Sequence, residues 1–499
     1  MHVDLRANGH LQTKTVAPGV IGAYHPFGHQ VTFLPDEGWR AVTEGRLSSL
    51  PDWIVQDLAA RHFLVSEAEE ARLVKELDTG PSGLGELWLV VVQSCNMACQ
   101  YCVVEGNVED LERRKYSKPK DVFDSPLIVP DENGEPTLKG AGTQVDMMSP
   151  ETALAACDLF ERQLQTAGQA TPRVTFYGGE PMLNTAAIRA AVPRLRQIRW
   201  PGMGRADGPS LLIITNGQIY DAEFTDFLKA HSVMVSVSLD GMKRHHDAVR
   251  VNHGGGGTFE KAARSLERYI AAGLSCGICT TIGRHNVDDL PEIADYFAER
   301  FGVAVEFQVP FDIGCGGNDY YVPMVEAFPK AMEAYERLRR RGLIEGLAFK
   351  RVAEMAAGGT RRTDCSAIGS QITVSPDGAM GPCHSLVGER IGFSGHVSDP
   401  AFDPFQTEAF REWAGRYPLN MPDCQGCSAI GICGGGCPYN AMIKKGSIWE
   451  KDPQQCSYMH AFVDWFIDDC WGRYQAATGM TVQPAAASAT DGARQFEQA

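Results

Sequence analysis

The 499-residue sequence lacks a membrane span, a signal segment and an excess of basic residues. No apolar run approaches the length that crosses a bilayer, and the opening residues, MHVDLRANGH, contain no apolar signal segment. Asp and Glu outnumber Lys and Arg by 62 to 46, and the formal net charge is −16. This charge argues against a nucleic-acid partner, which requires a basic face. We therefore expect a soluble, cytoplasmic protein that binds neither a membrane nor a nucleic acid.

Cysteine, by contrast, is abundant. The chain has fifteen cysteines, and in a cytosolic protein that number indicates metal or redox chemistry in place of a disulfide framework. The sequence contains no internal repeat, and 44% of its residues are apolar. A chain of this length and composition is long enough for two or three domains with sizeable cores.

Apolar strands alternate with helical stretches between residues 86 and about 310. The predicted strands are residues 88–92, 173–177, 211–215, 233–239, 274–282 and 303–309. The predicted helices between them are residues 150–164, 184–198, 221–230, 258–272 and 290–301. Such alternation is typical of a parallel sheet with right-handed crossovers, and six units are too few for a closed eight-fold barrel. We predict an α/β fold with a partial (β/α)₆ TIM-like barrel over residues 86–320, with ligands gathered at the carboxyl ends of its strands.

The remaining segments differ in composition from the barrel. Residues 1–80 predict a winged-helix-like N-terminal module behind a Gly/Pro-rich linker at 78–86. Residues 106–148 are polar and turn-rich, which favours a lid or a substrate-contacting insert. The rest is predicted as a helical bridge over 321–360, a cysteine-rich domain over 361–475 and a disordered tail over 476–499.

Three cysteines follow the first predicted strand with the spacing C-x₃-C-x₂-C. They are Cys95, Cys99 and Cys102. A structural zinc ion takes four protein ligands, and a catalytic one takes three plus water. Iron–sulfur cubanes are usually held by four thiolates, so a cubane with three cysteines leaves one iron open to a small molecule. A zinc site and three unrelated buried thiols are the alternatives.

Marked residues also lie at the ends of the next three strands. YGGEP occupies 177–181, TNG occupies 215–217, and SLDG occupies 238–241, with Arg250 shortly after it. Each motif alone is ordinary turn chemistry. Together, at one rim with the three cysteines, they indicate a binding site. For Arg250 the alternative is an ordinary surface ion pair.

This combination resembles the radical S-adenosylmethionine (SAM) superfamily. The resemblance implies that Cys95, Cys99 and Cys102 hold a 4Fe–4S cluster whose fourth iron is chelated by the amino and carboxylate groups of SAM. The other SAM contacts that it implies are Gly178, Gly179 and Glu180 at the amino group, and Ser238 and Arg250 at the carboxylate. An arginine fork suits a carboxylate, and glycine lets a backbone approach a ligand closely.

A second cysteine set resembles the seven-cysteine SPASM pattern. Its members are Cys365, Cys383, Cys424, Cys427, Cys433, Cys437 and Cys456, with Gly378 between the first two. The family's interleaved ligation implies two auxiliary 4Fe–4S clusters. The first would be held by Cys365, Cys383 and Cys437, and the second by Cys424, Cys427, Cys433 and Cys456. A zinc ribbon is the competing interpretation.

The first auxiliary set lacks an obvious fourth ligand. Cys315, in the stretch FDIGCGGND, is a candidate, and an iron left open for substrate is the rival. The sequence does not decide between them. The cysteines that remain lie in helix or strand patterns and are predicted to be core thiols: Cys157, Cys276, Cys279 and Cys470.

The resemblance also implies a function. SPASM-bearing members mostly modify ribosomally made peptides or proteins, so we expect a SAM-dependent maturase with three 4Fe–4S clusters. Its expected partners are a precursor peptide or small protein subunit and a one-electron reductant such as flavodoxin or ferredoxin. The N-terminal module resembles the domains with which several peptide maturases grip a leader.

His384 bears on the subgroup. Sulfatase maturases place a catalytic Asp directly after the cysteine that corresponds to Cys383, where this chain has His384. The resemblance therefore favours thioether-forming maturases, such as those of cysteine-rich peptides and of the quinohemoprotein amine dehydrogenase. Three alternatives stay open: a formylglycine-generating sulfatase-maturase-like enzyme, a radical enzyme acting on RNA or a small molecule, and a non-catalytic electron-transfer scaffold.

Thioether formation also needs a base or an iron that takes over the substrate thiolate. Asp399, Asp403 and Glu408 lie between the two groups of SPASM cysteines and are candidate bases. A solvated acidic loop is the alternative.

Overall fold

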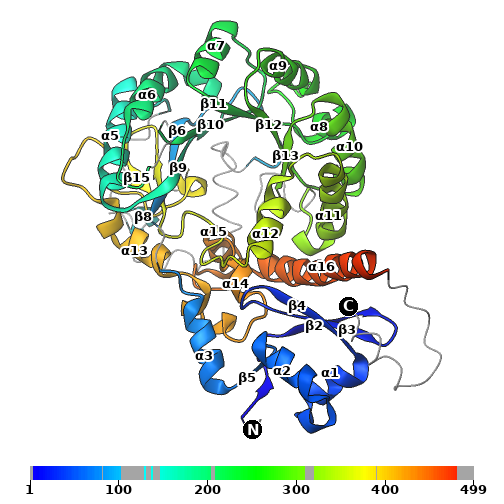
Figure 1. The fold of residues 1–499 in the computed structure, drawn as a ribbon. Coiled ribbons are helices and arrows are strands. Elements are labelled where there is room, and N and C mark those ends of the chain that lie inside the picture. The colour runs from blue at the N-terminus through cyan, green and yellow to red at the C-terminus, as the bar shows by residue number, and fades with distance from the viewer. Residues whose placement is uncertain are drawn as a thin grey trace.

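The computed structural model describes residues 4–80, 83–102, 128–130, 136–138, 146–203, 208–308, 320–388 and 390–479. Figure 1 shows a barrel-like layer of strands with helices outside it, an N-terminal module below, and a long C-terminal helix between the two. Most of the predicted insert at 106–148, Cys315, and the tail from residue 480 lie outside the described residues.

Six neighbouring parallel strands form the barrel wall, as predicted. In spatial order they are β13 (Ala304–Gln308), β12 (Cys276–Thr281), β11 (Val233–Ser238), β10 (Ser210–Thr215), β9 (Gly168–Gly178) and β6 (Leu84–Val92). Each overlaps a predicted strand, and the near-continuous apolar run of β6 suits a strand that is buried on both faces. The α/β partial barrel is therefore confirmed.

Amphipathic helices cover the outer face of this sheet (Figure 1). They are α5 (Pro150–Ala167), α6 (Thr185–Gln197), α7 (Ala222–Ala230), α8 (Lys243–Val249), α9 (Phe259–Ala271), α10 (Leu290–Arg300) and α11 (Met324–Arg340). Leu89, Phe176 and Ile213 of the strands are fully buried in one apolar core with Phe160 and Leu266 of the helices. Burial of this apolar surface is the main force that holds the barrel together.

The cysteine-rich region adds a strand to the barrel sheet, which was not predicted. Strand β14 (Gln371–Val374) pairs in parallel with β6, in the register Gln371↔Glu86, and β15 (Met380–Gly381) pairs antiparallel with β14. The predicted domains at 86–320 and 361–475 thus share one sheet. As a result Cys383, two residues after β15, is carried to the barrel edge beside β6.

The described part of the N-terminal module contains a three-stranded sheet, a two-stranded sheet and three α-helices. An antiparallel sheet of β2 (Gln12–Ala17), β3 (Val20–His25) and β4 (Gln30–Pro35) is followed by α1 (Asp36–Thr43), α2 (Asp52–Ala60), β5 (Leu64–Val65), which pairs with β1 (Arg6–Ala7), and α3 (Glu67–Glu76). The module has its own core around Ala23, Trp39 and Phe63.

The same module also packs firmly against the C-terminal helix α16 (Pro453–Thr478). Gly22 of β3 approaches α16 so closely that a Cβ there would lie 2.5 Å from Cγ2 of Ile467. Gln12 donates a hydrogen bond to Asp464 (2.7 Å), and Lys14 pairs with Asp468. The module is therefore docked on the C-terminal region, in addition to being joined through the 78–86 linker.

The rest of the described chain is mostly helical. It comprises α12 (Gly346–Ala356), α13 (Glu408–Gly415), α14 (Ile430–Cys433), α15 (Pro438–Lys445), the strand pair β7 (Ile128–Pro130) and β8 (Pro136–Leu138), and 3₁₀ turns at Leu47–Ser49, Pro181–Asn184, Val287–Asp289, His384–Leu386, Pro404–Gln406, Pro418–Asn420 and Pro422–Cys424. Helices α11 and α12 fit the predicted bridge at 321–360.

The predicted start of the disordered tail, residue 476, lies inside helix α16. Asp452 caps α16 by accepting hydrogen bonds from the backbone N–H groups of Gln454 and Gln455, Pro453 follows at the first helical position, and the helix continues through Thr478.

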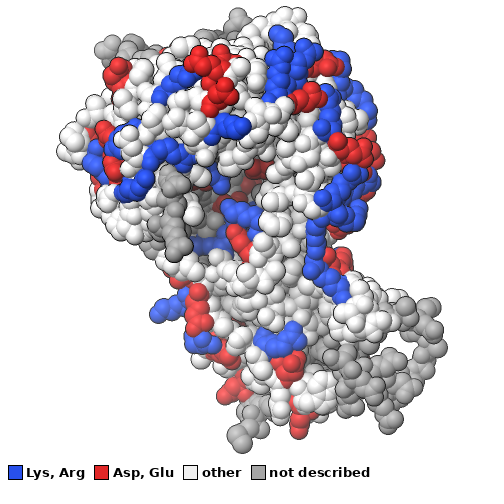
Figure 2. All heavy atoms as spheres, turned by 45° about the horizontal axis from the view of Figure 1, so that its top comes forward, with Lys and Arg blue, Asp and Glu red and all other residues white. Residues whose placement is uncertain are grey.

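None of the helices in the described ranges is both long and apolar enough to span a membrane. On the face shown in Figure 2, basic and acidic side chains are interspersed around the barrel.

Candidate active site

The loop with Cys95, Cys99 and Cys102 lies at the carboxyl end of β6, and all three thiols are half-buried. Backbone hydrogen bonds hold this loop against the end of α8 and the residues after it: Ala98 N–H donates to Val251 O (2.8 Å) and Gln100 N–H to Val249 O (3.0 Å). Three half-buried thiols on one loop suit a cubane with one open iron, as the sequence predicted.

Gly178 and Gly179 allow the end of β9 to touch this loop. Gly178 has φ +145°, and a Cβ there would lie 2.0 Å from the carbonyl oxygen of Val92. A Cβ on Gly179 would lie 2.3 Å from the carbonyl oxygen of Ser94. Only glycine fits both positions, because any side chain would push the Cys95 loop away from the sheet.

Glu180 ties the end of β9 to the end of β10. Its fully buried carboxylate accepts hydrogen bonds from Thr215 Oγ1 (2.7 Å), the Asn216 N–H (2.7 Å) and the Met182 N–H (3.0 Å). Burial raises the pKa of Glu180 to about 7, although these hydrogen bonds act in the opposite direction. Its predicted contact with the amino group of SAM stays a prediction.

Asn216 connects this network to the first cysteine. Its Nδ2 donates to Asn96 Oδ1 (2.7 Å) and lies 3.5 Å from Cys95 Sγ. Sequence analysis had singled out the TNG motif without giving Asn216 this role. Through these hydrogen bonds Glu180 and Asn216 together orient the loop that carries Cys95.

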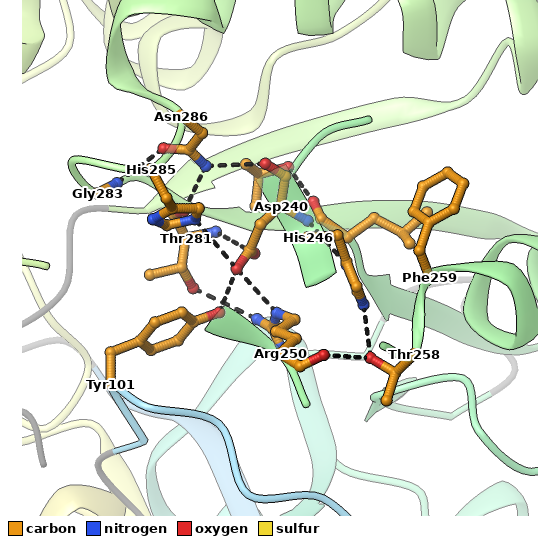
Figure 3. A network of polar contacts seen from close by, with 12 residues as sticks. Tyr101, Asp240, His246, Arg250, Thr258, Phe259, Thr281, Gly283, His285 and Asn286 are labelled. Atoms are coloured by element: carbon orange, nitrogen blue, oxygen red, sulfur yellow. Dashed lines mark hydrogen bonds and ion pairs between the residues drawn. The ribbon is translucent and has the colours of Figure 1, made fainter. Parts of the chain in front are cut away.

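Arg250 forms a buried ion pair, so the alternative of a surface ion pair is wrong. Its Nε lies 3.0 Å from Oδ2 of Asp240, which is fully buried, and its guanidinium lies over the ring of Tyr101 (Figure 3). Burial would raise the pKa of Asp240, but Arg250, His285 and His246 together outweigh burial and hold that pKa well below its usual range. Ser238, the other predicted carboxylate contact, is buried at the end of β11, two residues before Asp240.

Tyr101 links the cysteine loop to this ion pair. It stands between Cys99 and Cys102, and its hydroxyl donates to Oδ2 of Asp240 (Figure 3). Asp240 also accepts the N–H of Thr281 (3.1 Å). Sequence analysis missed both Tyr101 and Asp240, although Tyr101 lies within the C-x₃-C-x₂-C segment and Asp240 within the SLDG motif.

We expect Tyr101→Phe to weaken SAM binding roughly tenfold, equivalent to about 1.4 kcal/mol. The variant removes the hydroxyl that orients Asp240, and Arg250 then loses its fixed position at the rim. SAM affinity is measured from the change in the cluster's EPR spectrum as SAM is added without oxygen. Tyr296→Phe, which removes a hydroxyl bonded to Arg300 on helix α10, is the matched control. Equal SAM affinity in the two variants would contradict the role of Tyr101.

The structure brings the SPASM cysteines together in the two predicted sets. Cys365, Cys383 and Cys437 belong to one apolar cluster, and Tyr177 packs against the same cluster. Burial raises the pKa of Cys437 well above its usual value, and the neighbouring thiols of Cys365 and Cys383 raise it further. Three thiols in mutual electrostatic contact are what a shared cluster requires.

The second set surrounds a cavity of about 120 Å³. Its four thiols are Cys424, Cys427, Cys433 and Cys456. Across the described ranges, no three His, Cys, Asp or Glu side chains converge as they would on a single metal ion. Four thiols around one cavity are the ligand number of a cubane, which is also that of a structural zinc ion.

His384 lies between the barrel and the first auxiliary set. Its ring stacks on Trp88 of β6 (centroids 4.0 Å apart, 6° between planes) and meets Tyr177 of β9 edge-on at 5.2 Å. Burial lowers the pKa of His384 to about 4, so the ring is neutral at neutral pH. Tyr177 directly precedes Gly178, so the aromatic contacts connect the predicted SAM site to the Cys383 region.

The three candidate bases have structural roles at the surface. Asp403 caps a 3₁₀ turn and accepts a hydrogen bond from Gln163 of the outer helix α5 (3.3 Å). Asp399 is exposed and accepts the N–H of Ala401, and Glu408 is exposed in the first turn of α13. These positions support the alternative of a solvated acidic loop.

One predicted core thiol is placed differently. Cys157 is buried in the barrel core, and Cys276 and Cys470 pack against apolar clusters. Cys279 instead follows Ile278, which belongs to the core, and therefore points to the inner face of β12. Burial raises the pKa of the Cys279 thiol to about 12, Glu306 raises it further, and Arg250 acts in the opposite direction.

Residues 89–297 match the family model described as "Radical SAM superfamily". The chain carries a radical SAM domain. The predicted resemblance to the radical SAM superfamily is thus confirmed, and so is the prediction of a SAM-dependent modifying enzyme. Among curated relatives, the radical SAM cyclopropyl synthase TigE of Paramaledivibacter caminithermalis is 22% identical over 393 residues, which are 78% of this chain and 74% of that protein. A cysteine-type anaerobic sulfatase-maturating enzyme of Clostridium perfringens is 23% identical over 50% of this chain and 70% of its own length.

Solved radical SAM structures share the fold. The sulfatase-maturase structure anSMEcpe with bound AdoMet is 18% identical, with a TM-score of 0.58 over 80% of this chain and 96% of that one. Streptococcus suis SuiB bound to S-adenosylmethionine is 13% identical, with a TM-score of 0.51 over 90% of this chain and 99% of that one. At these identities the likeness concerns the fold alone.

Proposed function

We propose that this radical SAM enzyme modifies a ribosomally made peptide or protein subunit by joining a substrate Cys to a substrate carbon in a thioether. The observation that carries the proposal is the contact between the predicted SAM site and the first auxiliary set of cysteines. Tyr177, at the end of β9, packs in the same cluster as Cys365, Cys383 and Cys437. A substrate in the barrel would then lie between the SAM site and an electron acceptor.

The residues of the chain have distinct tasks in this proposal. When bound, SAM and its cluster supply a 5′-deoxyadenosyl radical, and the auxiliary clusters supply a place for the departing electron. Glu180, Asn216 and the two glycines fix the cysteine loop. Tyr101 and Asp240 hold Arg250 ready for a carboxylate. The surrounding barrel excludes water from the radical.

His384 supports cross-linking over formylglycine formation. Where sulfatase maturases carry a catalytic Asp, this chain has an imidazole that is neutral and stacked on Trp88. The likeness to sulfatase-maturating enzymes keeps formylglycine formation as the second candidate.

The product distinguishes the candidates. Enzyme, SAM, reductant and candidate peptide are incubated without oxygen, free thiols are alkylated, and masses are measured. Thioether formation removes two hydrogens for each link and protects the linked Cys from alkylation. A carbon–carbon bond also removes two hydrogens but leaves every thiol open to alkylation. Formylglycine replaces the Cys side chain with an aldehyde. Either of the last two results would contradict the thioether proposal.

The N-terminal module is proposed to bind the part of the substrate that is not modified. Its small sheet has its own core, and an antiparallel sheet with a free edge suits an added peptide strand. Deleting the module would expose the apolar face of α16, so the test keeps the chain whole.

We expect a photo-reactive group on the unmodified segment of the peptide to label residues 4–80. The labelled site is identified by proteolysis and mass spectrometry, with the photo-reactive group moved next to the modified Cys as the control. Labels confined to the barrel in both cases would show that the module takes no part in recognition.

A one-electron reductant such as flavodoxin or ferredoxin completes the proposed set of partners.

A further inference from the structure

Arg416 is a fully buried arginine whose hydrogen bonds all go to neutral groups. It follows α13, is 0% exposed, and is the largest side chain that is completely buried. Nη1 donates to the carbonyl of Gly436 (3.2 Å), Nη2 to that of Glu450 (3.1 Å), and Nε to that of Ile448. These bonds give each guanidinium nitrogen one acceptor, but none of the three acceptors carries a negative charge.

Other buried arginines in the described ranges are paired. Arg250 pairs with Asp240 (3.0 Å), Arg351 with Asp364 (2.6 Å) and Arg390 with Asp377 (2.6 Å). Arg416 has no carboxylate within ion-pairing distance among the described residues. An unpaired buried cation is strongly destabilising unless other negative charge offsets it.

The negative groups around Arg416 are mainly cluster cysteines. Arg416 Nη1 bonds the Gly436 carbonyl, within the segment that joins Cys433 of the second set to Cys437 of the first. Burial lowers the pKa of Arg416, and negative charge on Cys437, Asp452, Cys424 and Cys433 opposes that effect. Cys437 belongs to the first auxiliary set, and Cys424 and Cys433 belong to the second. Arg416 therefore lies between the two auxiliary sites.

The carboxylate of Asp452 also acts on Arg416. Its oxygens are already occupied. They accept the N–H of Cys437 (3.2 Å) and Nδ2 of Asn440 (2.6 Å), and they cap helix α16. Asp452 thus offsets part of the Arg416 charge from a distance, and the rest requires a further anion.

We propose that Arg416 is a shared counter-charge for the two auxiliary clusters and raises the reduction potential of both. This inference rests on the auxiliary clusters of the proposed function. A cubane held by three or four thiolates is an anion, and reduction makes it more negative. A fixed cation in a low-dielectric interior stabilises the reduced form more than the oxidised form. Arg416 would therefore make both clusters better acceptors for an electron from the substrate.

The test compares Arg416→Lys with Arg416→Met. Lysine keeps the charge and methionine removes it at similar length. Each protein is reconstituted without oxygen, its iron is counted, and its clusters are titrated with reductant by EPR. We expect the reduction equilibrium of both auxiliary clusters to fall by at least about tenfold in Arg416→Met, which is 59 mV for a one-electron couple, and by much less in Arg416→Lys. The cluster at Cys95, Cys99 and Cys102 should not change and serves as the internal control.

Three results would overturn the inference. The first is unchanged auxiliary potentials in Arg416→Met. The second is an equal fall in both variants, because the guanidinium would then act through packing and not through charge. The third is a shift in only one auxiliary cluster. If Arg416→Met holds too little iron, Arg416→Gln tests the loss of charge in the same way. Wild-type protein with only one cluster would instead contradict the proposed function.

Discussion

Replacing Cys95, Cys99 and Cys102 together by alanine should abolish 5′-deoxyadenosine formation and remove about a third of the iron. The three thiols share one loop at the end of β6, and the two auxiliary sets lie elsewhere in the fold. Loss of this loop's cluster should therefore leave the other two in place. The enzyme would keep most of its iron but could not cleave SAM.

The measurement is iron content together with 5′-deoxyadenosine released in the presence of SAM and dithionite. Cys276→Ala with Cys470→Ala is the matched control, since both thiols pack against apolar clusters and belong to neither set. Continued 5′-deoxyadenosine release by the triple variant would show that these cysteines do not hold the catalytic cluster.

Cys427→Ala should separate substrate cross-linking from SAM cleavage. Cys427 lines the cavity of the second auxiliary set, far along the chain from the SAM contacts. Removing one of four thiols disrupts the cluster that this cavity would hold. We expect cross-linked product to fall by at least about tenfold while 5′-deoxyadenosine release falls by less than about twofold, because the variant loses a step after the radical is made.

The control for this variant is Cys470→Ala, on the helix that also carries Cys456. It should change neither rate. Parallel loss of product and of 5′-deoxyadenosine in Cys427→Ala would contradict a separate role for the auxiliary set. Full cross-linking in that variant would remove the second set from the chemistry altogether.

The barrel and the cysteine sets could be predicted because their signals are local. A strand such as Leu84–Val92 is an apolar run, and the spacings of Cys95 to Cys102 and Cys424 to Cys437 are read directly from the sequence. The pairing of β14 with β6 could not be predicted in this way. A four-residue strand, Gln371–Val374, gives little periodicity, and nothing in it specifies a partner nearly three hundred residues earlier.

The same reason explains what was missed at the site. Tyr101 and Asp240 are 139 positions apart, and only the fold brings the hydroxyl to the carboxylate. Docking of the N-terminal sheet on α16 likewise depends on Gly22 and Ile467 meeting face to face. For the predicted bases the sequence is ambiguous for a different cause, because acidic residues in turns are commonly caps, as Asp403 is.

The central claim is that this radical SAM enzyme takes a hydrogen atom from a carbon of a peptide. The most direct measurement uses a candidate peptide carrying deuterium on the side chains near its cysteines. After incubation with SAM and reductant without oxygen, the mass of the released 5′-deoxyadenosine is determined. The account predicts deuterium in 5′-deoxyadenosine whenever modified peptide is formed. Modified peptide accompanied only by unlabelled 5′-deoxyadenosine, with every deuterated position tested in turn, would contradict it.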